Sequence, residues 1–249
     1  MATTRELDAF EDGLIEGFAQ HPVLANIRLL PDGDFAAVLL QRRFLSLAFT
    51  PSYDLAIDLL NDEAGRRIAR VILREEYPDS NGHTPSHRED MTHDLRLLGI
   101  PRTSLAGSRP TAATQKAITD TLDLIAEAGA EDDADLRLLT LLRFWGEVLV
   151  SVEYGRLWER MEPLLTHDGG NRSRFYYPHH LHDAKAHPLA AVSLLSTTHS
   201  DRLALRLSEL LAREESTAGF RETEERALEL KVSFYDQFLP ALERAPDPV

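Results

Sequence analysis

The stretch that decides the fold lies at residues 134–165 and reads ADLRLLTLLRFWGEVLVSVEYGRLWERMEPLL. Its apolar side chains recur at intervals of three and four residues, which is the spacing of one face of a helix. The acidic run at residues 131–133 supplies negative charge to the positive end of a helix dipole. We therefore predict one long helix here, closed by the turn-forming residues 168–171.

The same spacing governs most of the chain, whereas strict alternation of apolar and polar residues is hard to find, so the predicted fold class is all-α. Capping residues, prolines and glycines place further helices at residues 4–20, from 22 onwards, and at 34–47, 51–60, 66–77, 86–98 and 111–129, with two more helical stretches after residue 171 that are broken near 196–200 and 217–219. We see no internal repeat and no long linker, so residues 1–249 are predicted to form a single domain.

Composition narrows the possible chemistry. The 249 residues are 43% apolar and contain no cysteine, which excludes disulfides, thiolate metal sites and a cysteine nucleophile. Lysine and arginine number 27 against 41 acidic residues, so the formal charge of −14 disfavours nucleic acid and anionic membranes as partners. Charges interrupt every apolar run before membrane-spanning length, and the first residues carry acids where a signal peptide is basic. We expect a cytoplasmic protein.

Seven of the ten histidines gather in two places, three at residues 83–93 and four at residues 179–187. On a helix of about 100° per residue, His180, Asp183 and His187 share one narrow stripe, whereas His182 points the other way and is interpreted as solvated. A single histidine on a helix is more often a core or surface side chain than a ligand. Three converging groups of this kind favour a metal site within a helical bundle.

Glu153 is the partner that the long helix offers to such a site. It lies on an apolar seam with Leu149 and Leu157, one turn before and one turn after it. A buried carboxylate needs a cation or a proton, and a metal ion is the strongest compensation. The alternative is a salt bridge to an arginine such as Arg143 or Arg156.

Two further donors lie on either side of the turn-rich loop at residues 78–85, one before it and one after it. Glu76 lies one turn after apolar residues of the preceding helix, and His87 shares a face with Met91. Glu75 or His83 replaces one of them if the register differs. Three carboxylates and three histidines are enough for two iron or manganese ions. The predicted catalytic and metal-binding residues are Glu76, His87, Glu153, His180, Asp183 and His187.

These residues resemble a known family, the haem-oxygenase-like diiron oxidases and oxygenases. The motifs that carry the resemblance are Ile72-Leu73-Arg74-Glu75-Glu76-Tyr77, His87 ahead of Gly99-Ile100, Val152-Glu153, Tyr176-Tyr177 before His180–His187, and the early Gln20-His21-Pro22-Val23-Leu24. The resemblance covers nearly the whole chain. It implies a compact bundle of seven or more helices, commonly dimeric. It also implies a non-haem iron pair that activates dioxygen against small molecules, often amino-acid or fatty-acid derivatives in specialised biosynthesis.

Carried over by position, the resemblance assigns the first three ligands to Glu76, His87 and Glu153, and the paired histidines to His180 and His187. Two departures from the family pattern stand out. The loop between the first glutamate and the first histidine is one residue longer, and position 184, where the family has aspartate, is alanine. Either His179, Asp183 and His187 form the triad through a π-bulge, or Asp183 binds from a shifted angle, or one ligand is missing and the second iron is held weakly. Pro188 removes an N–H and favours a distortion.

The function predicted from this set is an oxygen-activating diiron enzyme that oxidises or cleaves a small molecule and draws on an electron donor. The predicted substrate cavity is lined by Phe44, Leu47, Trp145 and Leu149. Arg43 or Arg156 is a candidate partner for a substrate carboxylate. A homodimer is the expected assembly.

Three alternatives remain open from the sequence. The chain could be a non-catalytic, dimeric helical binding protein whose histidines form a polar network. It could hold a single iron ion, or it could be a cofactor-free oxidase of the same fold. Thiaminase-like relatives rely on a cysteine, which this chain lacks.

Overall fold

The quoted stretch forms one continuous helical run in the computed structural model, which describes residues 3–78, 84–193, 195, 198–213 and 217–244. The run consists of α8 (Ala134–Arg143), a π-helical turn η2 (Phe144–Val148) and α9 (Leu149–Leu165), and is confirmed as the long helix expected. The apolar face of α8, η2 and α9 is almost fully buried. A hairpin of β1 (Thr166–His167) and β2 (Gly170–Asn171) closes the run, with Gly169 at a positive φ in the turn.

The all-α prediction is confirmed, and several helices begin at a residue whose side chain caps them. Thr3 with Glu6, and Ser86 with Glu89, form capping boxes at two of the starts. Gly99, at φ 84°, follows the end of a helix as expected. The remaining helices are α1 (Thr4–Ala19), α2 (Pro22–Ala25), η1 (Ile27–Leu29), α3 (Asp32–Leu59), α4 (Glu63–Glu75), α5 (His87–Leu97), α6 (Arg102–Gly107), α7 (Ala112–Ala128), α10 (Tyr176–His182), α11 (His199–Leu211), α12 (Ala218–Asp236) and α13 (Leu239–Leu242).

Apart from shifts of a few residues at helix ends, the helix pattern differs from the sequence predictions in three places. Helix α3 continues through Pro51, because buried residues before and after the proline, Ala48 and Tyr53 among them, hold both halves in the core. A short helix, α6, occupies part of the break expected at residues 101–110. Helix α10 ends at His182, well before His187. Pro188 lacks an N–H and disfavours helical backbone at the residue before it, so it opposes an extension of this helix.

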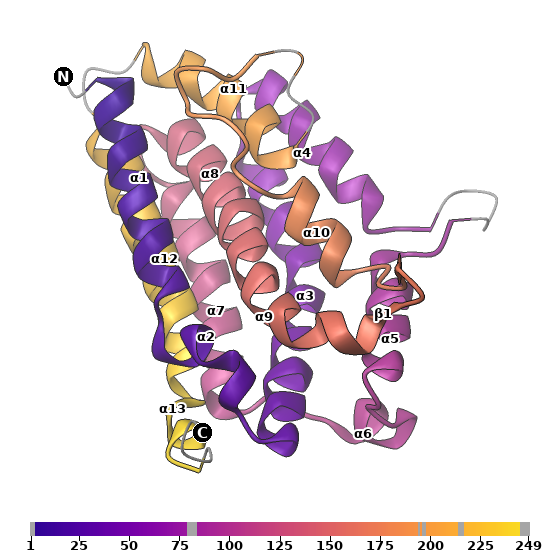
Figure 1. Ribbon diagram of the computed structural model, residues 1–249. Coiled ribbons are helices and arrows are strands. Elements are labelled where there is room, and N and C mark those ends of the chain that lie inside the picture. The colour runs from indigo at the N-terminus through magenta and orange to yellow at the C-terminus, as the bar shows by residue number, and fades with distance from the viewer. Residues whose placement is uncertain (1–2, 79–83, 194, 196–197, 214–216, 245–249) are drawn as a thin grey trace.

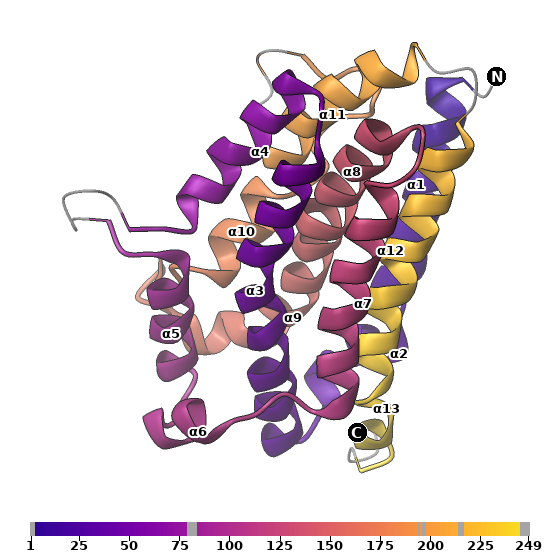
Figure 2. The same cartoon turned by 180° about the vertical axis from the view of Figure 1, so that it is seen from behind.

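The helices form a bundle around one apolar core that includes residues from Leu7 to Ala241. Helices α1, α3, α7, α12 and the α8–α9 run lie side by side, and α12 packs against both α7 and α8 (Figures 1 and 2). On the other side of the run, α10 packs against α9, and α11 packs against α8 and α4. The described helices include none with the length and apolar character needed to cross a membrane.

Candidate metal centre

A cavity of about 430 Å³ lies between the α8–α9 run and the helices that cover it. It is lined by side chains of α3, α4, α5, η2, α9, α10, α11 and α12. Most of the wall is apolar, and the chemically active side chains on it come from segments far apart in the sequence. Those that can bind a metal are Glu76, His87, Glu147, His179, His182, Asp183 and His199.

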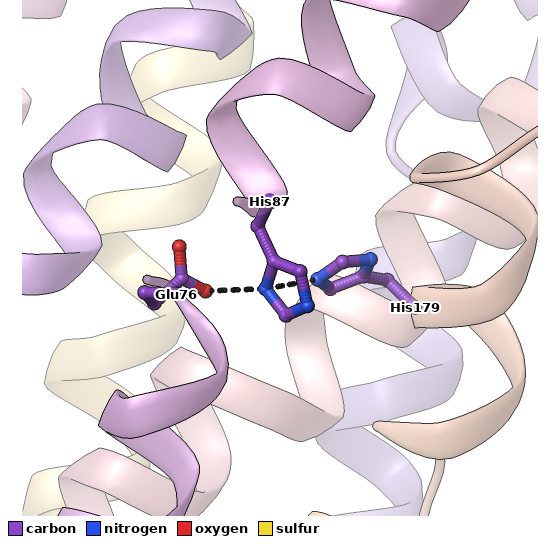
Figure 3. A group of neighbouring side chains, drawn as sticks. All are labelled: Glu76, His87 and His179. Carbon is purple, nitrogen blue, oxygen red and sulfur yellow. Dashed lines mark hydrogen bonds and ion pairs between the residues drawn. The ribbon is translucent and has the colours of Figure 1, made fainter. Parts of the chain in front are cut away.

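The first group on this wall joins the end of α4, the start of α5 and α10. The Glu76 Oε1 atom lies 2.8 Å from His87 Nδ1, and His87 Nδ1 lies 3.3 Å from His179 Nε2. Figure 3 shows the three side chains converging from separate helices. One donor atom of each lies within 4.8 Å of the other two, so the group can hold a metal ion.

His179 is oriented for metal binding by the backbone of its own helix. Its Nδ1 lies 2.7 Å from the carbonyl oxygen of Phe175, which can only accept a hydrogen bond. Nδ1 therefore carries the proton, and the lone pair of Nε2 faces His87. Burial lowers the pKa of His179 to about 3, so the ring stays neutral. A neutral imidazole, positioned through its other nitrogen, is the form that ligates metals.

The second group joins the end of α10 to the start of α11. Asp183 Oδ1 lies 2.5 Å from His182 Nδ1 and 3.4 Å from His199 Nδ1, and the three donor atoms again lie within 4.8 Å of one another. Glu147, from the π-helical turn η2, brings its Oε2 to 3.3 Å from His199 Nδ1. The other oxygen of Glu147 accepts a hydrogen bond from Tyr53.

Electrostatics concentrate positive charge on His199. Burial alone would lower its pKa, but hydrogen bonds to Asp183, Glu147 and Glu75 raise it to about 12. Burial would raise the pKa of Asp183, but hydrogen bonds from His182 and His199 hold it well below its usual range. Burial and the charge of Asp183 raise the pKa of Glu147 to about 7. The carboxylates thus compete for one imidazolium, and a divalent cation would relieve that competition.

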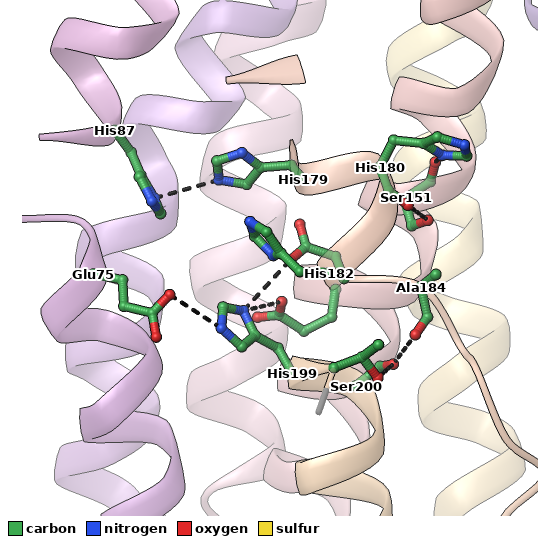
Figure 4. Close-up of polar contacts among 12 residues, drawn as sticks. Glu75, His87, Ser151, His179, His180, His182, Ala184, His199 and Ser200 are labelled. Atoms are coloured by element: carbon green, nitrogen blue, oxygen red, sulfur yellow. Dashed lines mark hydrogen bonds and ion pairs between the residues drawn. The ribbon is translucent and has the colours of Figure 1, made fainter. Parts of the chain in front are cut away.

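The two groups adjoin each other on the cavity wall. The ring centroids of His179 and His182 are 4.7 Å apart, and those of His182 and His199 are 4.9 Å apart (Figure 4). The donors are imidazole nitrogens and carboxylate oxygens only, which suit iron or manganese. In composition and placement the residues present therefore fit a pair of such ions, with Glu75 positioned to orient His199 through its Nε2 at 3.2 Å.

Of the six ligands predicted from sequence, the structure brings three into these groups, namely Glu76, His87 and Asp183. His179, which the sequence left as an alternative to His180, belongs with them. Glu75 also lies beside the centre, as an ion-pair partner of His199. His83, another alternative, lies outside the described residues.

Glu153 is not brought into either group, and its predicted place as a ligand needs correction. Its carboxylate is fully buried, as expected, but it forms ion pairs with Arg42 at 2.6 Å and Lys231 at 3.2 Å. The alternative of a salt bridge is therefore the arrangement observed, although with different partners from Arg143 and Arg156. Arg143 pairs with Glu11 instead. Two cationic side chains already compensate the charge of Glu153, so no metal is needed there.

His180 and His187 also lie outside both groups, because the helix that was to align them ends at His182. The His180 ring turns to the opposite side of α10, with Nδ1 3.0 Å from the carbonyl oxygen of Ser151 (Figure 4). It occupies the space above Gly155, where a Cβ atom would lie 2.7 Å from the ring. His187 is half exposed, and its Nδ1 pairs with Asp201 at 2.5 Å. Their roles as metal ligands are not supported by this geometry.

Sequence reasoning missed Glu147, His182 and His199. Glu147 is the lone acid in the apolar run from Leu138 to Val150, which marked it as a buried carboxylate at least as clearly as Glu153. His182 was predicted to be solvated because the stripe of His180, Asp183 and His187 was taken to face the site, whereas it is His182 that lines the cavity and His180 that turns away. His199 lies in a separate helix after an irregular segment, and no sequence spacing connects it to Asp183.

The expected cavity lining is found in part. Leu47 and Trp145 lie on the wall, whereas Phe44 and Leu149 are not among the lining residues. Arg43 and Arg156 are also outside the lining, and Arg156 donates to the carbonyl oxygen of Ala19 instead.

Comparisons with known proteins identify the fold. No protein-family model matches the sequence, and no curated protein matches it either. Among solved structures, a TenA family transcription regulator from a Silicibacter species is similar over 96% of this chain and 97% of its own, with a TM-score of 0.59 and 16% identity. A CADD-like protein of unknown function from Nostoc punctiforme is similar over 98% of this chain and 99% of its own, with a TM-score of 0.63 and 13% identity. The chain therefore has the helical, haem-oxygenase-like fold of TenA-family and CADD-like proteins.

Proposed function

We propose that this protein is a non-haem diiron oxidase or oxygenase that uses dioxygen to oxidise a small molecule. The observation that carries the proposal is the meeting of two adjoining histidine and carboxylate groups on the wall of one cavity. One iron is assigned to Glu76, His87 and His179, and the second to Glu147, His182, Asp183 and His199. Bound iron would supply the redox chemistry that amino-acid side chains lack.

The chain's own residues supply orientation and exclusion of water. The carbonyl of Phe175 holds His179 in the tautomer that presents Nε2, and Tyr53 holds one oxygen of Glu147. Apolar side chains line the space beside the donors, so a substrate held there would lose part of its contact with water. These walls are formed by Leu45, Phe49, Ile72, Met91, Trp145 and Val150.

The partners follow from this chemistry and stay proposals. The enzyme would need dioxygen, a small organic substrate and an electron donor to return the iron to its reduced form. A homodimer and a cytoplasmic location complete the proposal. The net charge of −14 offers no attraction for nucleic acid, so we do not extend the description of the Silicibacter protein as a regulator to this chain.

Anaerobic titration with iron(II) tests the metal assignment. We expect two ions per chain in the native protein and the loss of at least one in Asp183→Ala. His187→Ala is the matched control, because this histidine lies outside both groups and should leave both ions bound. Oxygen consumption by the reduced protein should follow the number of ions bound. Binding of less than one ion per chain, or full binding by Asp183→Ala, would refute the proposal and leave a polar network in a binding protein.

A further inference from the structure

The cavity has a second polar wall, formed by two buried cations. Arg42 from α3 and Lys231 from α12 are only 2% and 1% exposed, and both line the cavity. They share one carboxylate, that of Glu153, which itself is not among the cavity-lining residues. The cations therefore stand between the cavity and their common counter-ion.

The charges of this wall do not balance. Arg42 and Lys231 carry two positive charges against the single negative charge of Glu153, which leaves an excess of one. Among the described residues, the hydrogen-bond acceptors of Arg42 are Glu153 and Ser46, fewer than the five N–H donors of a guanidinium. An unbalanced buried charge is costly, so a site of this kind favours the entry of an anion. One excess charge matches a monocarboxylate better than a doubly charged phosphate.

Two further polar groups extend the wall. The Ser46 hydroxyl lies 3.0 Å from Arg42 Nη1 and 3.0 Å from the Tyr154 hydroxyl. The Arg42 guanidinium lies over the Tyr154 ring, 4.9 Å from its centroid, and Lys231 Nζ lies 5.0 Å from the centroid of the Trp145 ring. The faces of the two aromatic rings attract these cations and help to hold both beside the cavity.

Tyr154 also connects this wall to the metal-binding groups. Its ring centroid is 6.1 Å from that of His179. A small molecule in the cavity can therefore contact Arg42 at one end and the histidine groups at the other. Between the two ends the wall is mainly apolar, with Leu45, Trp145 and Val150 among its residues.

We propose that Arg42, Lys231, Ser46 and Tyr154 form a carboxylate-binding subsite, which holds a small monocarboxylate with an apolar body and directs that body toward the histidine and carboxylate groups. The inference rests on the proposed function in treating this molecule as the substrate of the enzyme. The binding itself depends only on the cavity and its cations, so it can be tested without turnover.

Isothermal titration calorimetry with octanoate as the probe tests the subsite, with octanamide as a neutral probe of equal length. Both are measured on metal-free protein and on protein loaded with zinc(II), which undergoes no redox change. We expect octanoate to bind at least about tenfold more tightly than octanamide in both forms. Acetate should bind far more weakly, because it lacks the apolar body. Equal affinity for octanoate and octanamide would overturn the inference.

Three variants distinguish this subsite from an ion-pair cluster with a purely structural role. Lys231→Met should weaken octanoate binding about tenfold and leave octanamide binding unchanged. Glu153→Gln keeps the shape of the side chain but removes the competing carboxylate, so it should tighten octanoate binding at least about threefold. Arg156→Gln, a change outside the cavity lining, is the matched control and should have no effect. Unchanged octanoate affinity in both Lys231→Met and Glu153→Gln would overturn the inference. If one of these variants folds poorly, the comparison of octanoate with octanamide on the native protein still decides it.

The outcomes also separate this inference from the proposed function. If two metal ions bind and octanoate shows no preference over octanamide, the subsite is refuted and the metal centre stands. If octanoate binds selectively and no metal ion binds, the subsite stands as part of a binding protein and the enzymatic proposal fails. If octanoate binds only to the zinc(II)-loaded form and Lys231→Met has no effect, the probe binds the metal, and the subsite is refuted.

Discussion

Glu147 and Glu153 lie on the same helical run and are both buried, yet their surroundings differ completely. Glu153 forms ion pairs with Arg42 and Lys231, two buried cationic side chains from other helices. Glu147 meets His199 and the Tyr53 hydroxyl, and its pKa rises to about 7 through burial and the charge of Asp183. The surroundings of Glu153 stabilise its negative charge without a metal ion. The surroundings of Glu147 do so less well, so a bound metal ion would stabilise that carboxylate further.

Burial alone therefore does not assign a role to an acidic residue. Both glutamates satisfy the argument that a buried carboxylate needs a cation. Which cation each glutamate meets depends on the neighbouring helices, because Arg42 comes from α3, Lys231 from α12 and His199 from α11. The comparison predicts opposite behaviour for the two residues: loss of Glu153 should affect stability, and loss of Glu147 should affect metal binding.

The largest expected effect is on the stability of Glu153→Ala. This change leaves two buried cations without their counter-ion, so the free energy of unfolding should fall by about 3–5 kcal/mol. Metal stoichiometry should not change, because Glu153 contacts neither metal-binding group. Urea denaturation and metal analysis check both expectations. Glu159→Ala, a more exposed change on the same helix, is the control and should cost about 1 kcal/mol or less. If Glu153→Ala lost metal and kept its stability, Glu153 would behave as a metal ligand and the expected difference from Glu147 would be wrong.

The next effect is on metal affinity in Glu147→Gln. The amide can still accept the Tyr53 hydrogen bond but carries no charge, so affinity for the second metal should fall about 100-fold. The metal-free protein should keep its stability, because the substitution removes a carboxylate that is costly to ionise at this site. Competition with a metal-binding dye and urea denaturation provide the two measurements. Destabilisation as large as that of Glu153→Ala would show that both glutamates are structural.

The smallest expected effect is a pH dependence of the free energy of unfolding, caused by Lys231, the ion-pair partner of Glu153. Burial lowers the pKa of Lys231 from 10.5 to about 8, against the opposing charge of Glu153. Between these values the unfolded chain binds more protons than the folded one, so the stability contribution of Lys231 rises with pH. From about pH 8 to pH 9.5 the native protein should gain about 1–2 kcal/mol relative to Lys231→Met. Urea denaturation of both proteins across this range checks the sign, and a constant or falling difference would contradict it.

Much of the helical pattern could be predicted because it depends on local chemistry. The apolar spacing at residues 134–165, the cap at Ser86 and the stop at Gly99 each act within a few residues along the chain. Prolines were harder to interpret, since Pro51 remains inside a helix that packing holds together, whereas the segment containing Pro188 is not helical. The same local chemistry therefore has opposite outcomes in different tertiary surroundings.

The candidate site divides in the same way. Glu76, His87 and Asp183 were identifiable because each lies beside apolar residues or helix boundaries that the sequence displays. His199 was not, because its approach to Asp183 depends on how α11 packs against α8 and α4. A helical wheel also requires a helix, and the alignment of His180 with His187 disappeared where α10 ended.

An all-α fold, the absence of thiolate chemistry and a supply of histidines and carboxylates follow from the amino-acid sequence. Which of those donors meet depends on how the helices pack, and so does the pairing of Glu153 with cations and of Glu147 with His199. The physical reason is range: helix propensity and amphipathic spacing act between near neighbours along the chain, whereas ligation and ion pairing depend on distances of a few ångströms between helices that are remote in sequence.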